Sequence, residues 1–192
     1  MRLAALVCLS LLLGACVTTR PVAPVAATDW ASRAAFLQNA AQWQMSGRAA
    51  VAFGTQGWQA SLDWRQARSY AELHLAGPLG IGAQVIKQSA DGLSLNGTPP
   101  SSTALSQLQD KLGFELPVDR LRYWLLGVPD PRDTFDLERN DQDRARHLTQ
   151  DGWNVDYDRY TPVAGDQLPS RIVLTRADVR VRIVADHWEL KP

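Results

Sequence analysis

The stretch Trp58-Gln-Ala-Ser-Leu-Asp-Trp64 alternates apolar and polar side chains at every position. Successive side chains of a β-strand point to opposite faces, so this alternation predicts a strand with one buried face and one solvent-facing face. Residues 54–57 directly before it favour a tight turn, and residues 49–53 are suited to be the partner strand of a hairpin. The segment indicates an antiparallel sheet whose core lies on one side.

The same period of two returns on both sides of a helical middle segment. We expect further strands at residues 70–75, 83–87, 93–95, 153–157, 172–174 and 179–183. Asp91-Gly92 and Asn96-Gly97 are turn dipeptides, because Asn, Asp and Gly tolerate a positive φ. Many short one-faced strands joined by tight turns predict a single curved sheet or barrel.

Three segments follow the helical period instead. We expect helices at residues 30–43, 101–112 and 116–126. The first has Thr28 or Asp29 as its N-cap, while Gly113 and Gly127 stand where the second and third should end. We predict that the helices cover the open concave side of the sheet.

The N-terminus reads as a bacterial lipoprotein signal peptide over residues 1–15. Arg2 precedes a short apolar run, and small residues stand directly before Cys16, which we expect to be lipidated after cleavage. A simple secretory signal with a chance cysteine is the alternative. Val17 occupies the position where an Asp signals inner-membrane retention, so we expect an anchor on the periplasmic face of the outer membrane. Residues 16–28 would form a flexible tether to a single domain over residues 29–192.

The composition excludes several partner classes. Basic and acidic side chains balance at 20 each, and removal of residues 1–15 takes away only Arg2. Without a basic stripe, nucleic acid is not an expected partner. The other cysteine, Cys8, leaves with the signal, so no disulfide is expected and the fold depends on its apolar core.

The sequence shows no pattern of an enzyme, and we expect no catalytic residues, metal or cofactor. His74, His147 and His187 have no partners at metal-ligand spacing, and neither a nucleophile elbow nor a phosphate-binding loop is present. Acidic residues near turns lack the glycine and glutamate of an EF-hand loop.

Seven tryptophans are many for a chain of 192 residues. Five of them, Trp58, Trp64, Trp124, Trp153 and Trp188, could converge inside the sheet. Such an interior either fills with its own side chains or holds an apolar ligand, and periodicity does not decide between the two.

The loop Ala76-Gly77-Pro78-Leu79-Gly80 places a leucine between Pro and Gly at a strand junction, where its side chain would project. An exposed leucine is ordinary by itself. On a lipid-anchored protein, however, it could touch a bilayer or a lipid cargo.

Several motifs together resemble the LolB family of outer-membrane lipoprotein receptors. They are Leu75-Ala-Gly-Pro-Leu-Gly80, Leu116-Pro-Val-Asp-Arg-Leu-Arg-Tyr-Trp-Leu-Leu-Gly-Val-Pro129, Gly152-Trp-Asn-Val-Asp-Tyr157 with Tyr160, and Leu168-Pro169. Residues 132–149 match no motif, so nothing functional is carried over to them.

The resemblance implies a mainly β fold, an unclosed antiparallel β-barrel with a helical lid and an apolar cavity for acyl chains. It implies a monomer that accepts acylated lipoproteins from a LolA-like periplasmic carrier and inserts them into outer-membrane lipid. Leu79, with Pro78 and Gly80, matches the protruding membrane-insertion loop. The candidate cavity residues are Trp58, Trp64, Leu73, Leu75, Leu121, Trp124, Leu125 and Trp153.

Two other classes of function stay open at this stage. A structural or accessory lipoprotein of an outer-membrane assembly complex would use strand edges or surface patches and need no cavity. A lipid-modifying enzyme would need a nucleophile with a partnered base, which the sequence does not display.

Overall fold

The computed structural model describes residues 29–191. Ten strands form one antiparallel sheet in the order β5-β4-β3-β2-β1-β10-β9-β8-β7-β6. The strands are β1 (Gln42–Phe53), β2 (Gln56–Ala67), β3 (Tyr70–Ala76), β4 (Gln84–Ser89), β5 (Gly92–Leu95), β6 (Phe135–Arg139), β7 (Ala145–Gln150), β8 (Trp153–Val163), β9 (Asp166–Arg176) and β10 (Val179–Lys191).

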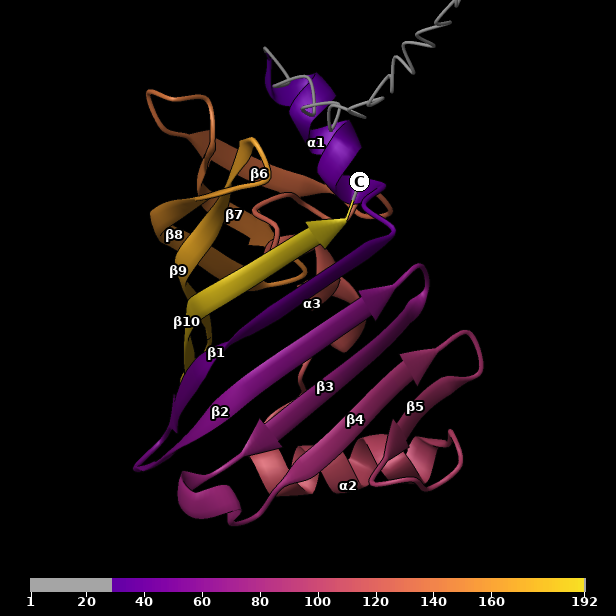
Figure 1. Cartoon of the computed structure of the whole chain (residues 1–192). Coiled ribbons are helices and arrows are strands. Elements are labelled where there is room, and N and C mark those ends of the chain that lie inside the picture. The colour runs from indigo at the N-terminus through magenta and orange to yellow at the C-terminus, as the bar shows by residue number, and fades with distance from the viewer. Residues whose placement is uncertain (1–28, 192) are drawn as a thin grey trace, which may run out of the picture.

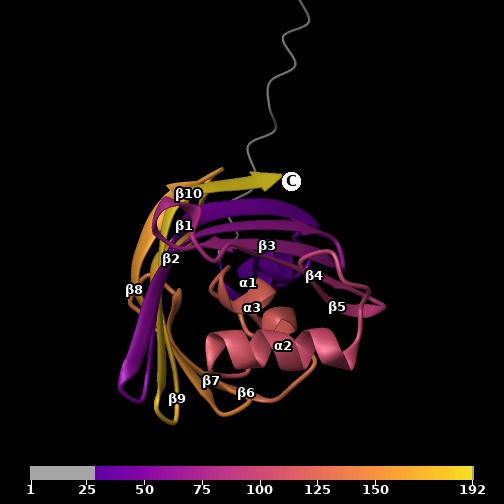
Figure 2. The ribbon, with the colours of Figure 1, turned by 90° about the horizontal axis from the view of Figure 1, so that it is seen from below.

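The sheet curves around the helices without closing on itself. The first and last strands, β1 and β10, pair at its centre, while β5 and β6 stand at the two ends of the strand order. Figure 2 shows α1, α2 and α3 inside the curve, and Figure 1 looks onto the outer, convex face. The prediction of an unclosed antiparallel barrel with a helical lid is confirmed.

The hairpin expected around residues 58–64 is β1–β2, and its burial follows the predicted alternation. Ala60, Leu62 and Trp64 are buried on the concave face, while the side chains between them are exposed. One position on β1 tolerates no side chain, because a Cβ on Gly47 would lie 2.1 Å from the carbonyl oxygen of Val184 on β10. This close approach coincides with a register shift between β1 and β10.

Two of the predicted helices are shorter than expected. α1 covers Trp30–Gln38, and Asp29 caps it by accepting a hydrogen bond of 3.0 Å from the backbone N–H of Ser32. The prediction that this helix continues to Trp43 is wrong. Trp43 belongs to strand β1, and its side chain is buried in the core. α3 covers only Val118–Trp124.

The helix α2 covers Ser102–Leu112, close to its predicted range. The side chain of Ser101 accepts the capping hydrogen bond, and Gly113 ends the helix with a φ of +83°. Residues 132–149, which match no motif of the family, contain β6 and all of β7 except its last residue. β6 is an edge strand whose side chains are almost all exposed, so it lacks the alternation that marks a half-buried strand.

Candidate functional site

An apolar cavity lies between the concave face of the sheet and the helices α2 and α3. Every lining side chain is aliphatic or aromatic. The lining residues are Ala49, Val51, Trp58, Leu62, Trp64, Leu73, Leu75, Leu112, Phe114, Leu116, Leu121, Leu125, Val181 and Ile183. Strands β1, β2, β3 and β10 supply the floor, while α2, α3 and the linker between them supply the roof.

The cavity is small, with a volume of about 30 Å³. A single water molecule takes about 30 Å³ in the liquid, and pockets for lipid-sized ligands measure about 300–1,000 Å³. The interior is therefore almost filled by its own side chains. The space has no room for a lipid-sized ligand in this arrangement of the helices.

Six of the eight predicted cavity residues line this space, namely Trp58, Trp64, Leu73, Leu75, Leu121 and Leu125. Trp124 and Trp153 do not, although both are buried. Their rings pack against each other with centroids 6.3 Å apart, and Phe114 packs at the same distance against Trp153. The prediction missed eight of the lining residues, namely Ala49, Val51, Leu62, Leu112, Phe114, Leu116, Val181 and Ile183.

A second aromatic cluster packs beneath the centre of the sheet. Trp43 stacks on Trp64 with ring centroids 5.8 Å apart, and Trp188 lies 5.5 Å from Trp43. Trp64 donates to the side chain of Gln66, whereas the indole N–H of Trp58 is buried without an acceptor. The cavity wall thus contains one hydrogen-bond donor that the protein leaves unpaired.

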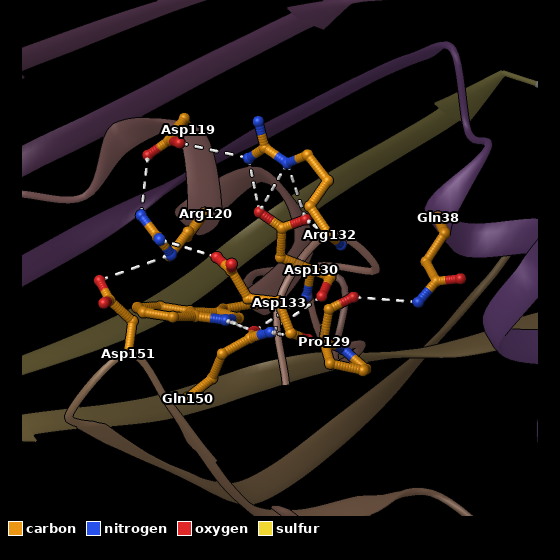
Figure 3. A network of polar contacts seen from close by, with 10 residues as sticks. Gln38, Asp119, Arg120, Pro129, Asp130, Arg132, Asp133, Gln150 and Asp151 are labelled. Carbon is orange, nitrogen blue, oxygen red and sulfur yellow. Dashed lines mark hydrogen bonds and ion pairs between the residues drawn. The ribbon is translucent and has the colours of Figure 1, made fainter. Parts of the chain in front are cut away.

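A buried glutamine fixes one end of α3 (Figure 3). The side chain of Gln150, on β7, accepts hydrogen bonds of 2.9 Å from the indole N–H of Trp124 and from the backbone N–H of Asp130. It also donates to the backbone carbonyls of Asp130 and Asp133, at 2.8 and 3.2 Å. α3 and the segment after it are thereby joined to the sheet.

Charged groups continue this network toward the surface. Arg120 of α3 makes an ion pair of 2.8 Å with Asp133 and one of 3.5 Å with Asp151. Arg132 makes ion pairs with Asp119 and with the fully buried carboxylate of Asp130. Burial raises the pKa of Asp130, but hydrogen bonds from Arg132 outweigh it and hold that pKa below its usual value. The carboxylate is therefore charged and paired.

The helix α1 is also tied to the sheet by polar contacts. The guanidinium of Arg33, itself buried, donates to the carboxylate of Asp166 at 2.9 Å and to the backbone carbonyl of Gln167 at 2.6 Å. Gln38 at the end of α1 donates to the carbonyl of Pro129. α1 and the segment after α3 therefore form one frame.

The helix α2 differs from the other two. Within residues 29–191, no hydrogen bond or ion pair joins residues 102–112 to another element of the fold. Ala104, Leu108 and Leu112 hold α2 in place through apolar contacts, and only its N-cap residue, Ser101, donates a backbone hydrogen bond of 3.2 Å to Leu93 of β5 within the described region. α2 is therefore the part of the roof with the fewest directional contacts.

The loop between β3 and β4 projects an apolar tip. Leu79 is 100% exposed and Ile81 is 71% exposed, more than any other large apolar side chain of the described region. A short helix, η1 (Pro78–Gly80), and a hydrogen bond from the N–H of Gly77 to the carbonyl of Ile81 give the loop a defined shape. Leu79 adopts a left-handed φ of 58°, which costs a non-glycine residue about 1–2 kcal/mol.

The predicted anchor, Cys16, lies outside the described residues, as do the predicted signal peptide and tether. From residue 29 onward, no helix has the length and apolarity needed to cross a bilayer. The same region contains no group of His, Cys, Asp and Glu side chains suited to hold a metal ion.

A family model and individual relatives point to the same protein family. Residues 41–188 match the family model described as "Outer membrane lipoprotein LolB". The outer-membrane lipoprotein LolB of Thiobacillus denitrificans is 32% identical over 100% of this chain and 99% of its own length. That of Stutzerimonas stutzeri is 30% identical, with 95% of this chain and 92% of the relative covered.

Among solved structures, the chain is similar to a LolA superfamily protein from Nitrosomonas europaea. The TM-score is 0.54 with 12% sequence identity, and the match covers 86% of this chain and 95% of that one. At that identity the likeness concerns the fold alone, and it places the curved sheet with its inner helices among known architectures.

Proposed function

The chain belongs to the LolB family of outer-membrane lipoproteins, and from that membership we propose that it receives lipoproteins from a LolA-type periplasmic carrier and inserts them into the outer membrane. Cys16 would anchor it there. The acyl chains of the cargo would lie between the concave face of the sheet and α2. The observation that supports this proposal is the all-apolar lining of the small space under the helices, whose fourteen residues would face an acyl chain once the roof has moved.

The energetics of acyl chains explain why such a cavity is needed. Each methylene exposed to water costs about 0.8 kcal/mol, so a chain of about sixteen carbons carries roughly 12 kcal/mol. Cargo must therefore pass from one apolar environment to the next. Because the sequence has no nucleotide-binding motif, transfer has to run downhill in affinity from carrier to receptor to bilayer.

Uptake requires the roof to open, and we propose that α2 moves while α1 and α3 stay. Moving α2 breaks no hydrogen bond to another element within the described region, whereas moving α3 breaks the contacts of Gln150 and Arg120. Exposing the two buried leucines of α2 costs about 3–6 kcal/mol. Burial of one acyl chain offsets that cost, so the opening is driven by the cargo itself.

Delivery would use the loop that carries Leu79. An exposed leucine and isoleucine on a loop of defined shape can enter the interfacial layer of a bilayer and bring the cargo to it. We expect Leu79→Glu to leave folding and cargo acceptance nearly unchanged, because this side chain touches neither the core nor the cavity. Release into membranes should fall sharply.

The test follows an acylated lipoprotein through both steps. Acceptance is measured by co-purification of cargo after mixing with a loaded LolA-type carrier, and release by its recovery in liposomes. Phe135→Glu is the matched control, since Phe135 is 48% exposed on β6, away from the loop. Equal delivery by Leu79→Glu and the parent would refute the role of the loop, and failure of the parent to accept cargo would refute the receptor function.

A further inference from the structure

A groove of about 830 Å³ lies on the convex face of the sheet beside the loop that carries Leu79. Residues Pro78–Gly80 form part of its wall, and three arginines, Arg48, Arg171 and Arg182, line it as well. The other lining side chains are small or neutral, and none is acidic. The groove is thus cationic on one side and bordered by an apolar tip on the other.

The sheet register brings the arginines together from three adjacent strands. Arg48 on β1 pairs with Val184 of β10, which in turn pairs with Arg171 of β9. Arg182 lies two residues from Val184 on the same strand, and its neighbours Val181 and Ile183 are buried on the concave side. Adjacent strands are about 4.8 Å apart, so side chains at these positions can reach one ligand.

Only one of the three charges is compensated within the described region. The carboxylate of Asp186 accepts hydrogen bonds from two nitrogens of Arg48, from Nε at 3.1 Å and from Nη2 at 2.9 Å. Neither Arg171 nor Arg182 has a carboxylate within ion-pair distance in residues 29–191, and the Nε of Arg171 is buried without an acceptor. Arg171 and Arg182 thus supply positive charge that no carboxylate of residues 29–191 neutralises.

We propose that this groove binds the phosphate of an anionic phospholipid headgroup while Leu79 and Ile81 enter the acyl layer beside it. Arginine suits this role because its planar guanidinium bonds two phosphate oxygens at once. The position favours a lipid over a free anion, since the apolar tip forms the wall of the same groove. The inference rests on the proposed membrane contact of the loop and adds a headgroup preference to it.

The experiment measures binding to vesicles with a chain that begins at Val17, which lacks the proposed acylation site and keeps every described residue. Vesicles of phosphatidylcholine alone are compared with vesicles that also contain phosphatidylglycerol. The test variant is Arg171→Gln with Arg182→Gln. The matched control is Arg65→Gln with Arg180→Gln, which removes the same charge from exposed positions outside the groove.

We expect the test variant to lose about thirtyfold in affinity for the phosphatidylglycerol vesicles, at about 1 kcal/mol for each arginine near an anionic surface. Its binding to phosphatidylcholine, whose phosphate is balanced by the choline cation, should fall less, and the control should lose less than the test variant on both. Arg171→Lys with Arg182→Lys keeps the charge but lacks the planar guanidinium. Its affinity for the phosphatidylglycerol vesicles should fall between those of the parent and the test variant.

Three outcomes would overturn the headgroup site: equal losses in test and control variants, a charge-keeping variant as weak as the glutamine variant, or inorganic phosphate binding as tightly as the vesicles do. Leu79→Glu separates this inference from the proposed function. Unchanged vesicle binding by Leu79→Glu refutes the membrane contact of the loop. Reduced binding by Leu79→Glu, with no effect of the arginine changes, refutes the groove alone.

Discussion

Replacing Gln150 by leucine tests whether α3 is a fixed wall of the site. Gln150 is 1% exposed and joins Trp124 to the backbone of Asp130 and Asp133. A leucine fills similar space but leaves the indole N–H of Trp124 and the N–H and carbonyl of Asp130 without partners. At about 1–3 kcal/mol for each of these three buried groups, the free energy of unfolding should fall by about 3–9 kcal/mol.

Urea denaturation followed by tryptophan fluorescence measures this loss. With a slope of about 2 kcal/mol per molar urea, the midpoint should fall by at least about 1.5 M. Gln142→Leu is the control, because the exposed side chain of Gln142 only accepts a hydrogen bond from Arg144, so this variant should stay within about 0.5 kcal/mol of the parent. A loss below about 1 kcal/mol for Gln150→Leu would refute the assignment of α3 to the rigid frame.

Two further predictions concern the C-terminal end of α2 and a carboxylate on β3. Gly113→Ala should lower stability by about 2 kcal/mol, since φ is +83° and the new Cβ would lie 2.2 Å from the Phe53 ring. In a chain that already carries Phe53→Ala, Gly113→Ala should cost less in urea denaturation than in the parent, and an equal cost in both would contradict the clash. Hydrogen bonds from His74 and Tyr70 lower the pKa of Glu72 to about 2. Its stabilising effect is therefore present above pH 4.5 and lost as the pH falls toward 2. A plot of Tm against pH should show this fall for the parent and a smaller one for Glu72→Gln, and identical slopes would contradict the prediction.

The alternation of side chains predicted the sheet because most strands bury one face only. It located β2 and β3 closely, since their apolar side chains occupy every second position.

The helix predicted at residues 30–43 was too long because two periods overlap there. Leu37, Ala41 and Met45 are four residues apart, as in a helix, while Trp43 and Met45 are two apart, as in a strand. Only the pairing of β1 with β2 and β10 decides between the two periods.

The cavity was harder to predict than the sheet. Trp124 and Trp153 are apolar and near the right elements, but they pack against each other, and one of them is held by a glutamine from β7. The eight lining residues that the prediction lacked come from β1, β2, β10, the end of α2 and the linker after it. Which apolar side chain faces a cavity depends on how helices cross the sheet, and a single sequence does not contain that information.

The parts of the proposed pathway meet at one end of the molecule. α2 ends at Gly113, against Phe53 at the end of β1, and Leu112 and Phe114 on either side of that glycine line the cavity. Figure 1 places the turn between β1 and β2 and the short helix η1 at this same lower end of the sheet. If the C-terminal end of α2 lifts, the cavity opens beside the exposed Leu79 and the arginine groove. Acyl chains would then leave the protein where it touches the bilayer, so their exposure to water between cavity and membrane stays short.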